Sequence, residues 1–411
     1  MKKSLFPTLG MVLLSAVACN EQSIAPDNDN PTNARELSAT EKVLVSKGND
    51  FGLTIFKKMA EAESDENLFI SSLSISIALG MTLNGANGET KTAMENTLGF
   101  AALSSEDINQ SYRDLIDLLT GLDAKVEFNI ANSIWSREGM PFLESFYNTN
   151  KSYFDAECRS LNFADPQTLE IINGWISDKT NGKIEDMLDY IPPDAVMYLI
   201  NAIYFNGTWT YAFDEERTAD HLFTDNNGQY LTCKMMWQKS EFNYLENDLF
   251  QAIDLPYGNG HFSMTIFLPN VSNSVETIIS QMSQNQWQSW LKAFTLDSIN
   301  VGLPKFKLEY KEELSKILTD LGMGIAFSGG ADFSKLLDGG GIYISRVIHQ
   351  SFLEVDEAGT EAAAATIVEM RETSAGGGPV EKFMIINRPF IFVIRDHHSQ
   401  TNLFMGRVLK I

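Results

Sequence analysis

Histidine is the side chain that most often serves as a general base, so the five histidines of this 411-residue chain come first. They are His221, His261, His349, His397 and His398. None lies in an HExxH pattern, and the chain has neither the GxSxG turn of a hydrolase nor a GKS or GKT phosphate loop. No Cys/His spacing is typical of a metal site. We therefore expect no enzyme, no cofactor and no bound metal.

Residues 357–374, EAGTEAAAATIVEMRETS, form a second notable pattern, in which small side chains alternate with charged ones. A strand period of two places small or apolar side chains on one face: Thr360, Ala362, Ala364, Thr366, Val368 and Met370. The charged Glu361, Glu369 and Arg371 fall on the other face. Taken without its context, the segment favours a surface helix, since alanine is the best helix former.

The elements that would position these residues change in type along the chain. Helical periodicity predicts helices over 45–62, 74–83, 89–98, 105–119 and 171–179. The apolar run 198–205 predicts a central strand buried on both faces, and further strands are expected over 262–268, 299–308 and 384–394. Helices followed by strands predict an α+β fold around a large sheet.

Several motifs occur together and give the chain a specific resemblance. Residues 384–394 read MIINRPFIFVI, and FMGRV follows at 404–408. Earlier motifs are NLFISSLSI at 67–75, TNGKI at 180–184, NAIYF at 201–205, LPKF at 303–306 and LGM at 321–323, with Gly207, Trp209 and Phe213 after the central strand. Over residues 42–411 the chain resembles the serpin family, and in particular bacterial lipoprotein serpins. It departs from the family at Ser72, where proline is usual.

The resemblance implies a fold and a mechanism. The fold is the serpin fold, in which helices surround a large mixed β-sheet, with further sheets and an exposed reactive-centre loop at about 357–380. The implied activity is irreversible suicide inhibition of serine proteases: the loop is cut, the protease is trapped as an acyl ester, and the loop inserts into the main sheet. The implied hinge comprises Glu357, Gly359, Thr360, Ala362 and Ala364.

The family spacing leaves the cut site open between two counts. Counted from Glu357, the scissile bond is Thr373–Ser374, which we prefer; counted from Pro389, it falls within 375–379. Thr373 suits an elastase-like protease, ranked first, and Arg371 a trypsin-like protease, ranked second. Val368 and Met370 are weaker alternative bait residues.

The resemblance also implies a hydrogen-bonded cluster that guards the opening of the sheet. Its residues are Ser71, Ser74, Asn201 and His349, with Trp209 near the point where the loop enters. Each polar residue is equally explained as a satisfied buried group.

Composition and the early residues restrict the partners. A net charge of −23 disfavours nucleic acid, because phosphate repels an acidic surface. Residues 104–110 are acidic, so we expect no heparin activation. The expected partners are target serine proteases, each bound in a covalent acyl-enzyme complex. The protein itself is expected to be a monomer. A non-inhibitory serpin acting as a surface carrier or adhesin is the alternative.

Residues 1–18 have the positive start and short apolar stretch of a signal peptide, followed by Cys19. The pattern predicts lipidation at Cys19, a flexible tether over 19–41 and a domain over 42–411. Ordinary cleavage after Ala18 is the alternative, because Ala16 replaces the usual leucine. We therefore expect an exported protein. It is either anchored by its lipid at the cell envelope, at the outer membrane surface, or extracellular. Its only contact with the membrane would be the lipid. The other cysteines, Cys158 and Cys233, are expected to be separate thiols.

Overall fold

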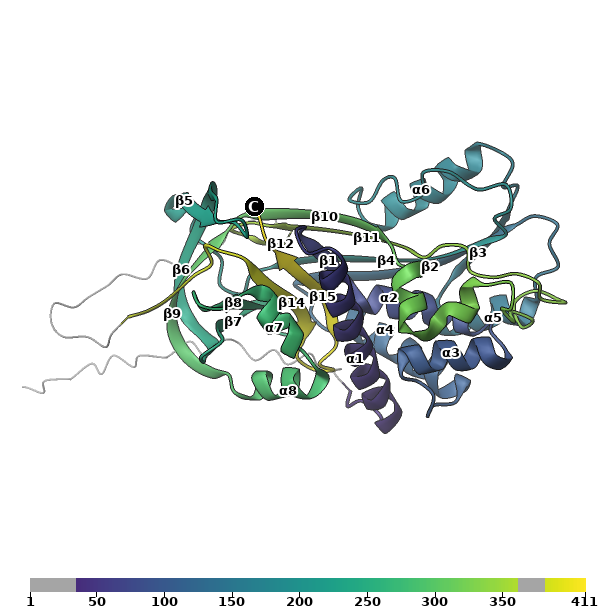
Figure 1. Ribbon diagram of the computed structural model, residues 1–411, viewed down its shortest axis with the longest axis horizontal. Coiled ribbons are helices and arrows are strands. Elements are labelled where there is room, and N and C mark those ends of the chain that lie inside the picture. Colours follow the sequence, from purple (N-terminus) through teal and green to yellow (C-terminus); the bar gives the residue numbers. More distant parts are fainter. Residues whose placement is uncertain (1–34, 361–380) are drawn as a thin grey trace, which may run out of the picture.

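The computed structural model describes residues 35–360 and 381–411. Two sheets and the helices around them form its framework (Figure 1). The α-helices are α1 (Ala39–Ala62), α2 (Ser72–Leu83), α3 (Gly88–Leu98), α4 (Ser105–Thr120), α5 (Glu144–Phe154), α6 (Gln167–Lys179), α7 (Val275–Gln281), α8 (Gln284–Lys292) and α9 (Ser315–Leu318). Short turns of helix are η1 (Glu215–Arg217), η2 (Thr319–Met323) and η3 (Gly324–Phe327).

The six-stranded sheet has the order β10-β11-β12-β4-β2-β3. Its strands are β2 (Val126–Arg137), β3 (Glu157–Leu161), β4 (Met197–Thr208), β10 (Phe306–Glu313), β11 (Ile348–Val355) and β12 (Gly359–Thr360). In Figure 1 this sheet runs along the long axis, with α6 above it and α2 to α5 below. The second core cluster, which includes Trp135, Trp175 and Ile176, packs beneath α6.

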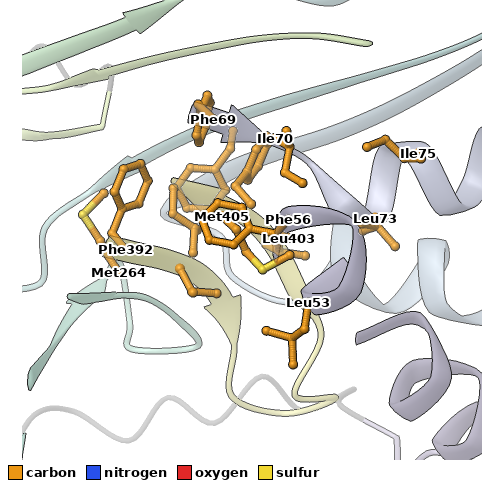
Figure 2. Packing of buried hydrophobic residues seen from close by; sticks show 14 of the residues in the cluster. Leu53, Phe56, Phe69, Ile70, Leu73, Ile75, Met264, Phe392, Leu403 and Met405 are labelled. Carbon is orange, nitrogen blue, oxygen red and sulfur yellow. The ribbon is translucent and has the colours of Figure 1, made fainter. Parts of the chain in front are cut away.

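The nine-stranded sheet has the order β1-β15-β14-β8-β7-β6-β9-β13, and β5 pairs with β6. Its strands are β1 (Leu68–Ile70), β5 (Ala219–Thr224), β6 (Tyr230–Glu246), β7 (Phe250–Tyr257), β8 (Phe262–Pro269), β9 (Thr295–Pro304), β13 (Lys382–Ile385), β14 (Phe390–Asp396) and β15 (Asn402–Val408). Figure 2 shows the core where this sheet meets the helices, with Phe69 of β1, Met405 of β15 and Phe56 of α1 in one hydrophobic cluster. In the same cluster the ring of Phe69 stacks on that of Phe404 of β15.

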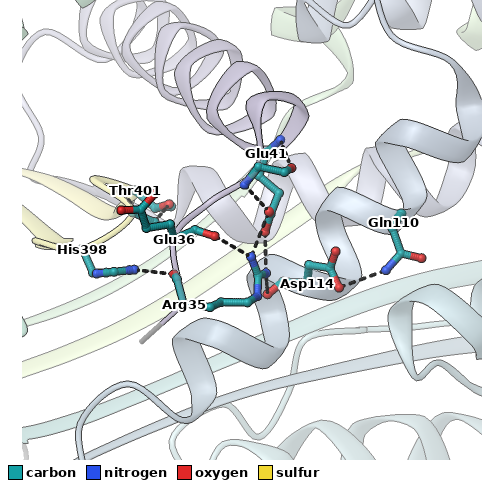
Figure 3. Close-up of polar contacts among 9 residues, drawn as sticks. Arg35, Glu36, Glu41, Gln110, Asp114, His398 and Thr401 are labelled. Carbon is teal, nitrogen blue, oxygen red and sulfur yellow. Dashed lines mark hydrogen bonds and ion pairs between the residues drawn. The ribbon is translucent and has the colours of Figure 1, made fainter. Parts of the chain in front are cut away.

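The N-terminal end of the described domain is fixed by polar contacts (Figure 3). Ser38 and Glu41 form a capping box that begins α1. The guanidinium of Arg35 forms an ion pair of 2.5 Å with Glu41 and donates to the carbonyl of Asp114 in α4, while the carbonyl of Arg35 bonds the His398 ring. Arg35, the first described residue, thus already contacts the fold, and α1 begins three residues before the domain boundary predicted at residue 42.

The α+β prediction is confirmed, and every predicted helix and strand has a counterpart. Two predicted strands are each divided: Lys305 separates β9 from β10, and residues 386–389 separate β13 from β14. Within the described residues no helix is both long and apolar enough to span a membrane. Cys158 and Cys233 are both free thiols, as predicted.

Candidate functional site

The six-stranded sheet has a gap between β4 and β11. The two-residue strand β12 fills only one end of the gap, beside the C-terminal ends of β4 and β11, which we call the upper end. There Gly359 pairs with Thr208 and Thr360 with Gly207 on β4, and Thr360 also pairs with Val355 on β11. Below this point, the described residues of β4 and β11 form no ladder with each other. Two strand edges therefore face each other across a space that one antiparallel strand could occupy.

Thr360 lies within the gap and is the last described residue before position 361, and it is held tightly. Its side chain is buried, and its hydroxyl lies 2.6 Å from the hydroxyl of Tyr257. The Tyr257 ring stacks on Trp209 at 4.3 Å between centroids, and the Trp209 indole donates to the carbonyl of Asp356 at 2.9 Å. Burial raises the pKa of Tyr257, so this phenol stays neutral and remains a hydrogen-bond donor. The predicted hinge therefore begins with two residues, Gly359 and Thr360, that lie between β4 and β11.

Gly359 is required where the hinge passes β4. A Cβ atom at this position would lie 2.1 Å from the carbonyl oxygen of Gly207 and 2.7 Å from Cα of Thr208. No side chain can be placed at that separation without moving backbone. The sequence interpretation of Gly359 as a flexible hinge thus acquires a second reason, which is close approach of two strands.

Glu357 fastens the same region to the neighbouring sheet. Its carboxylate accepts from the Lys305 ammonium at 2.7 Å and from the Thr218 hydroxyl at 2.8 Å. Burial alone would raise the pKa of this carboxyl. The hydrogen bonds from Lys305, from the backbone and from Thr218, together with the positive charge of Lys305, outweigh burial, so the pKa of Glu357 is lowered. Glu357 is therefore an anionic latch beside the upper end of the gap.

The predicted cluster lies lower, where α2 passes behind the gap. The Ser71 amide donates to Nε2 of His349 at 3.1 Å, and the Ser71 hydroxyl donates to the Leu403 carbonyl at 2.8 Å. The Ser74 hydroxyl donates to the Asn201 carbonyl at 3.4 Å, and the Asn201 amide to Asn132 at 2.8 Å. The structure thus brings Ser71, Ser74, Asn201 and His349 together, but places Trp209 with Tyr257 at the upper end.

His349 is held neutral by its surroundings. It is fully enclosed, and burial lowers the pKa of its ring to about 4. Because Nε2 accepts a hydrogen bond from the Ser71 amide, the proton of the neutral ring lies on Nδ1. An uncharged, oriented imidazole therefore stands on the β11 side of the gap, opposite Asn201 on β4.

A cavity of about 510 Å³ occupies the lower part of the gap. Residues 196–201 line its β4 side and residues 341–349 line its β11 side. Ile75 and Leu79 of α2 form part of its inner wall, and Met187 and Pro192 from the segment after α6 also line it. The space is therefore a real void between the strands.

Several contributors were not predicted from the sequence. Tyr257, Thr218 and Asn132 each bond a predicted residue, yet none of them belongs to a recognisable motif. Lys305 lay within the quoted LPKF motif, without a role. The calls on Cys19, Ala362, Ala364, Val368, Met370, Arg371, Thr373 and Ser374 fall outside the described residues.

Comparisons with known proteins agree with this geometry. Residues 46–411 match the family model described as serpin (serine protease inhibitor). The protein belongs to the serpin family. The leukocyte elastase inhibitor of Xenopus laevis is 34% identical to this serpin over 381 residues, which cover 89% of this chain and 98% of the relative.

Solved serpin structures match the whole fold. The native state of tengpin, a thermophilic serpin, superposes with a TM-score of 0.82 at 34% identity and covers 92% of this chain and 96% of its own. Human thyroxine-binding globulin in complex with thyroxine superposes with a TM-score of 0.83 at 26% identity. The match covers 90% of this chain and 99% of the globulin chain. The family thus contains protease inhibitors and carriers, and the predicted serpin fold is confirmed.

Proposed function

We propose that this serpin is an irreversible inhibitor of serine proteases that acts by inserting its cut loop between β4 and β11. The observation that carries the proposal is the gap itself: Gly359 and Thr360 close one end, and beyond them no described strand lies between β4 and β11, where the cavity is found. An inserted strand would satisfy the backbone groups of both facing edges.

The chemistry requires the target's own serine. Its hydroxyl oxygen attacks the carbonyl carbon of Thr373, the bond to Ser374 breaks, and the released amine of Ser374 takes up the proton. Thr373 is then joined to the protease through an ester. Insertion of residues 361–373 would carry the protease along before water hydrolyses that ester.

The register at the hinge predicts where each inserted residue would lie. Thr360 is opposite Gly207 and Val355, and each two-residue step down the loop moves two residues back along both strands. Ala362 would face Phe205 and Leu353, whose side chains are buried. Thr366 would arrive between Asn201 and His349, and Val368 and Met370 would enter the cavity. The predicted inward positions therefore meet an enclosed face, where small or apolar side chains are required.

The energy of insertion is large enough to drive this step. Roughly ten to fifteen new backbone hydrogen bonds at about 1 kcal/mol net each supply on the order of 10 kcal/mol. That equals the whole stability of an ordinary domain. The uncut protein must accordingly be kinetically trapped. The hydrogen bonds of Glu357 and Thr360 help to stabilise this uncut state.

For specificity we propose elastase-like targets, cut after Thr373, and then trypsin-like targets, cut after Arg371. The test is incubation of the protein with neutrophil elastase and with trypsin, followed by denaturing gels and mass spectrometry. A stable complex carrying the fragment up to Thr373 is expected. Cleavage without a complex would refute the proposal.

A carrier or adhesin is the second candidate, and the cavity together with the match to thyroxine-binding globulin favours it. The hinge argues against it, because Gly359 and Thr360 already occupy the gap and the following inward residues are small. A carrier would be cut without forming a covalent complex.

We further propose that the serpin is exported and lipid-anchored through Cys19, with residues 1–18 removed; the tether predicted over 19–41 would be shorter, because Arg35 and Glu41 are already packed against the domain. The anchor rests on the sequence pattern alone. Incorporation of labelled palmitate by the wild type and its loss in Cys19→Ser is the expected result. Equal labelling of both proteins would exclude Cys19 as the site.

A further inference from the structure

We infer that Ser72 is a positioning residue for loop insertion: its hydroxyl group fixes the start of α2, and α2 in turn holds the hydrogen-bonded cluster at the gap. The inference rests on the proposed function only where it concerns insertion. The Ser72 side chain is 2% exposed, and its hydroxyl donates to the carbonyl of Asn402 at 3.1 Å. A proline, which is usual in the family at this position, has no hydroxyl group and could not donate this bond.

Ser72 continues a ladder of hydrogen bonds that strand β1 begins. Strand β1 pairs with β15 as far as Ile70, and there the chain turns into α2. Two serine hydroxyls then take over from the backbone donors. The Ser71 hydroxyl donates to the carbonyl of Leu403 at 2.8 Å, and the Ser72 hydroxyl donates to the next carbonyl of β15, that of Asn402. The first turn of α2 is therefore fastened to β15 at two consecutive residues.

The neighbouring helix α1 supports the same place. The amide of Asn402 donates to Oδ1 of Asn49 at 2.9 Å, and Nδ2 of Asn49 donates to the carbonyl of Gln400 at 2.7 Å. A Cβ atom at Gly52 would lie 2.7 Å from Cβ of Ser72, so α1 and α2 can approach this closely only because residue 52 is a glycine. Ser72 thus lies where α1, α2 and β15 meet.

The position of α2 determines whether the cluster at the gap can form. Ser71 directly precedes Ser72, and its amide donates to Nε2 of His349 on β11. Ser74 follows two residues later, and its hydroxyl donates to the carbonyl of Asn201 on β4. Both donors belong to the first turn of α2, and their acceptors stand on the two sides of the gap. Loss of the Ser72 bond should therefore loosen the hold of α2 on both strands.

The first measurement needs no protease. Hydrogen exchange of the Ser71 amide is followed by NMR in the uncut full chain, in Ser72→Ala and in Ser76→Ala. Ser76 is the matched control, because it lies in the same helix, is 3% exposed, and bonds the hydroxyl of Tyr112 instead of β15. Since an amide exchanges when its bond opens, we expect exchange at Ser71 about tenfold faster or more in S72A, and within about twofold of wild type in S76A. Unchanged exchange in S72A would overturn the inference.

The second measurement tests the effect on insertion. Each uncut protein is held at constant temperature, and its remaining inhibitory activity against elastase is followed with time. Without the buried hydrogen bond of Ser72, the uncut loop should enter the gap sooner, so S72A should lose activity about fivefold faster or more. S76A should stay within about twofold of wild type, although it also lacks a buried hydroxyl. Equal losses in the two variants would show that Ser72 contributes only to general stability, and the positioning role would be wrong.

The two measurements separate this inference from the proposed function. If the wild type forms no covalent complex with any protease, the proposed function fails, whereas faster exchange at Ser71 in S72A still establishes that Ser72 fastens α2. If complexes form but S72A matches S76A in both measurements, the positioning role fails and the proposed function stands. Faster exchange in S72A together with faster loss of activity supports both.

Discussion

The ammonium of Lys305 lies 2.7 Å from the carboxylate of Glu357 and so ties the start of β10 to the segment that leads into the hinge. Lys305 is 40% exposed whereas Glu357 is 11% exposed, so solvent weakens the pair only from the lysine side. Thr218 bonds the other carboxylate oxygen. The predicted hinge is therefore held next to the gap by both carboxylate oxygens of Glu357.

Replacing Glu357 with glutamine should loosen this end of the gap. We expect a loss of about 1–2 kcal/mol, allowing for solvent at Lys305, and faster conversion of the uncut protein to an inactive, loop-inserted form. The rate of loss of inhibitory activity at constant temperature measures this. Glu309→Gln is the control, because Glu309 pairs with Lys307 at an exposed site; an equal effect of both substitutions would contradict the role of Glu357.

Acid should act on the same latch. The pKa of Glu357 is below its ordinary value of 4.5, so its stabilising effect is complete above that pH and is lost as the pH falls through the lowered value. The difference in unfolding midpoint between the wild type and E357Q should therefore shrink below about pH 4.5. A difference that stays constant to pH 3 would refute an ionic latch.

His349 predicts a second pH dependence in a higher window. Its pKa falls from 6.5 to about 4, so the folded state favours the neutral ring, and the stability it contributes is complete above pH 6.5 and lost as the pH falls toward 4. The shift corresponds to roughly 3 kcal/mol. Urea unfolding at pH 7 and pH 4 should show this loss in the wild type but not in His349→Gln. Parallel losses in both would exclude His349.

Thr360 predicts the effect of a charge at an inward position. Thr360→Arg would bury a guanidinium beside Tyr257, so insertion should stall and the serpin should become a substrate. The measured quantity is the number of serpin molecules cut per protease inactivated, which we expect to rise at least tenfold. Glu361→Arg, at a predicted outward position, should leave it near the wild-type value. Inhibition by T360R with unchanged stoichiometry would argue against insertion.

Heparin should not accelerate inhibition. Helix α4 carries Glu106, Asp107, Asp114 and Asp117, and its only basic residue, Arg113, already donates to the carbonyl of Ser152. A polyanion would be repelled by this surface. Rate constants with and without heparin at low salt should agree within twofold, and a large increase would show a basic site elsewhere.

The fold was predictable because its strongest elements are continuous apolar runs. Residues 198–205 are almost entirely apolar, and the observed strand β4 extends the prediction by only one residue at its start and three at its end. Strand β2 was missed because it lacks a continuous apolar run. In its first part the exposed Glu127 and Asn129 alternate with buried residues. In its later part three of the buried residues are polar: Asn132, Ser133 and Ser136. Burial of polar residues depends on partners distant in sequence, such as the Phe154 carbonyl that accepts from Asn132.

The site was predictable only in part for the same reason. Ser71, Ser74, Asn201 and His349 were placed together through the family resemblance, not through their spacing. Tyr257 was missed because its role depends on the register that brings Thr360 beside it. The cavity could not be predicted either, since it exists only because β4 and β11 stand apart.

Insertion of the cut loop between β4 and β11 is the central claim, and thermal unfolding before and after cleavage tests it most directly. The protein is cut within 361–374 by a protease that it does not trap, and the nicked and intact forms are heated. About 10 kcal/mol of added stability predicts a rise in unfolding temperature of roughly 20 °C or more. Equal unfolding temperatures for the two forms would show that the gap does not receive the loop.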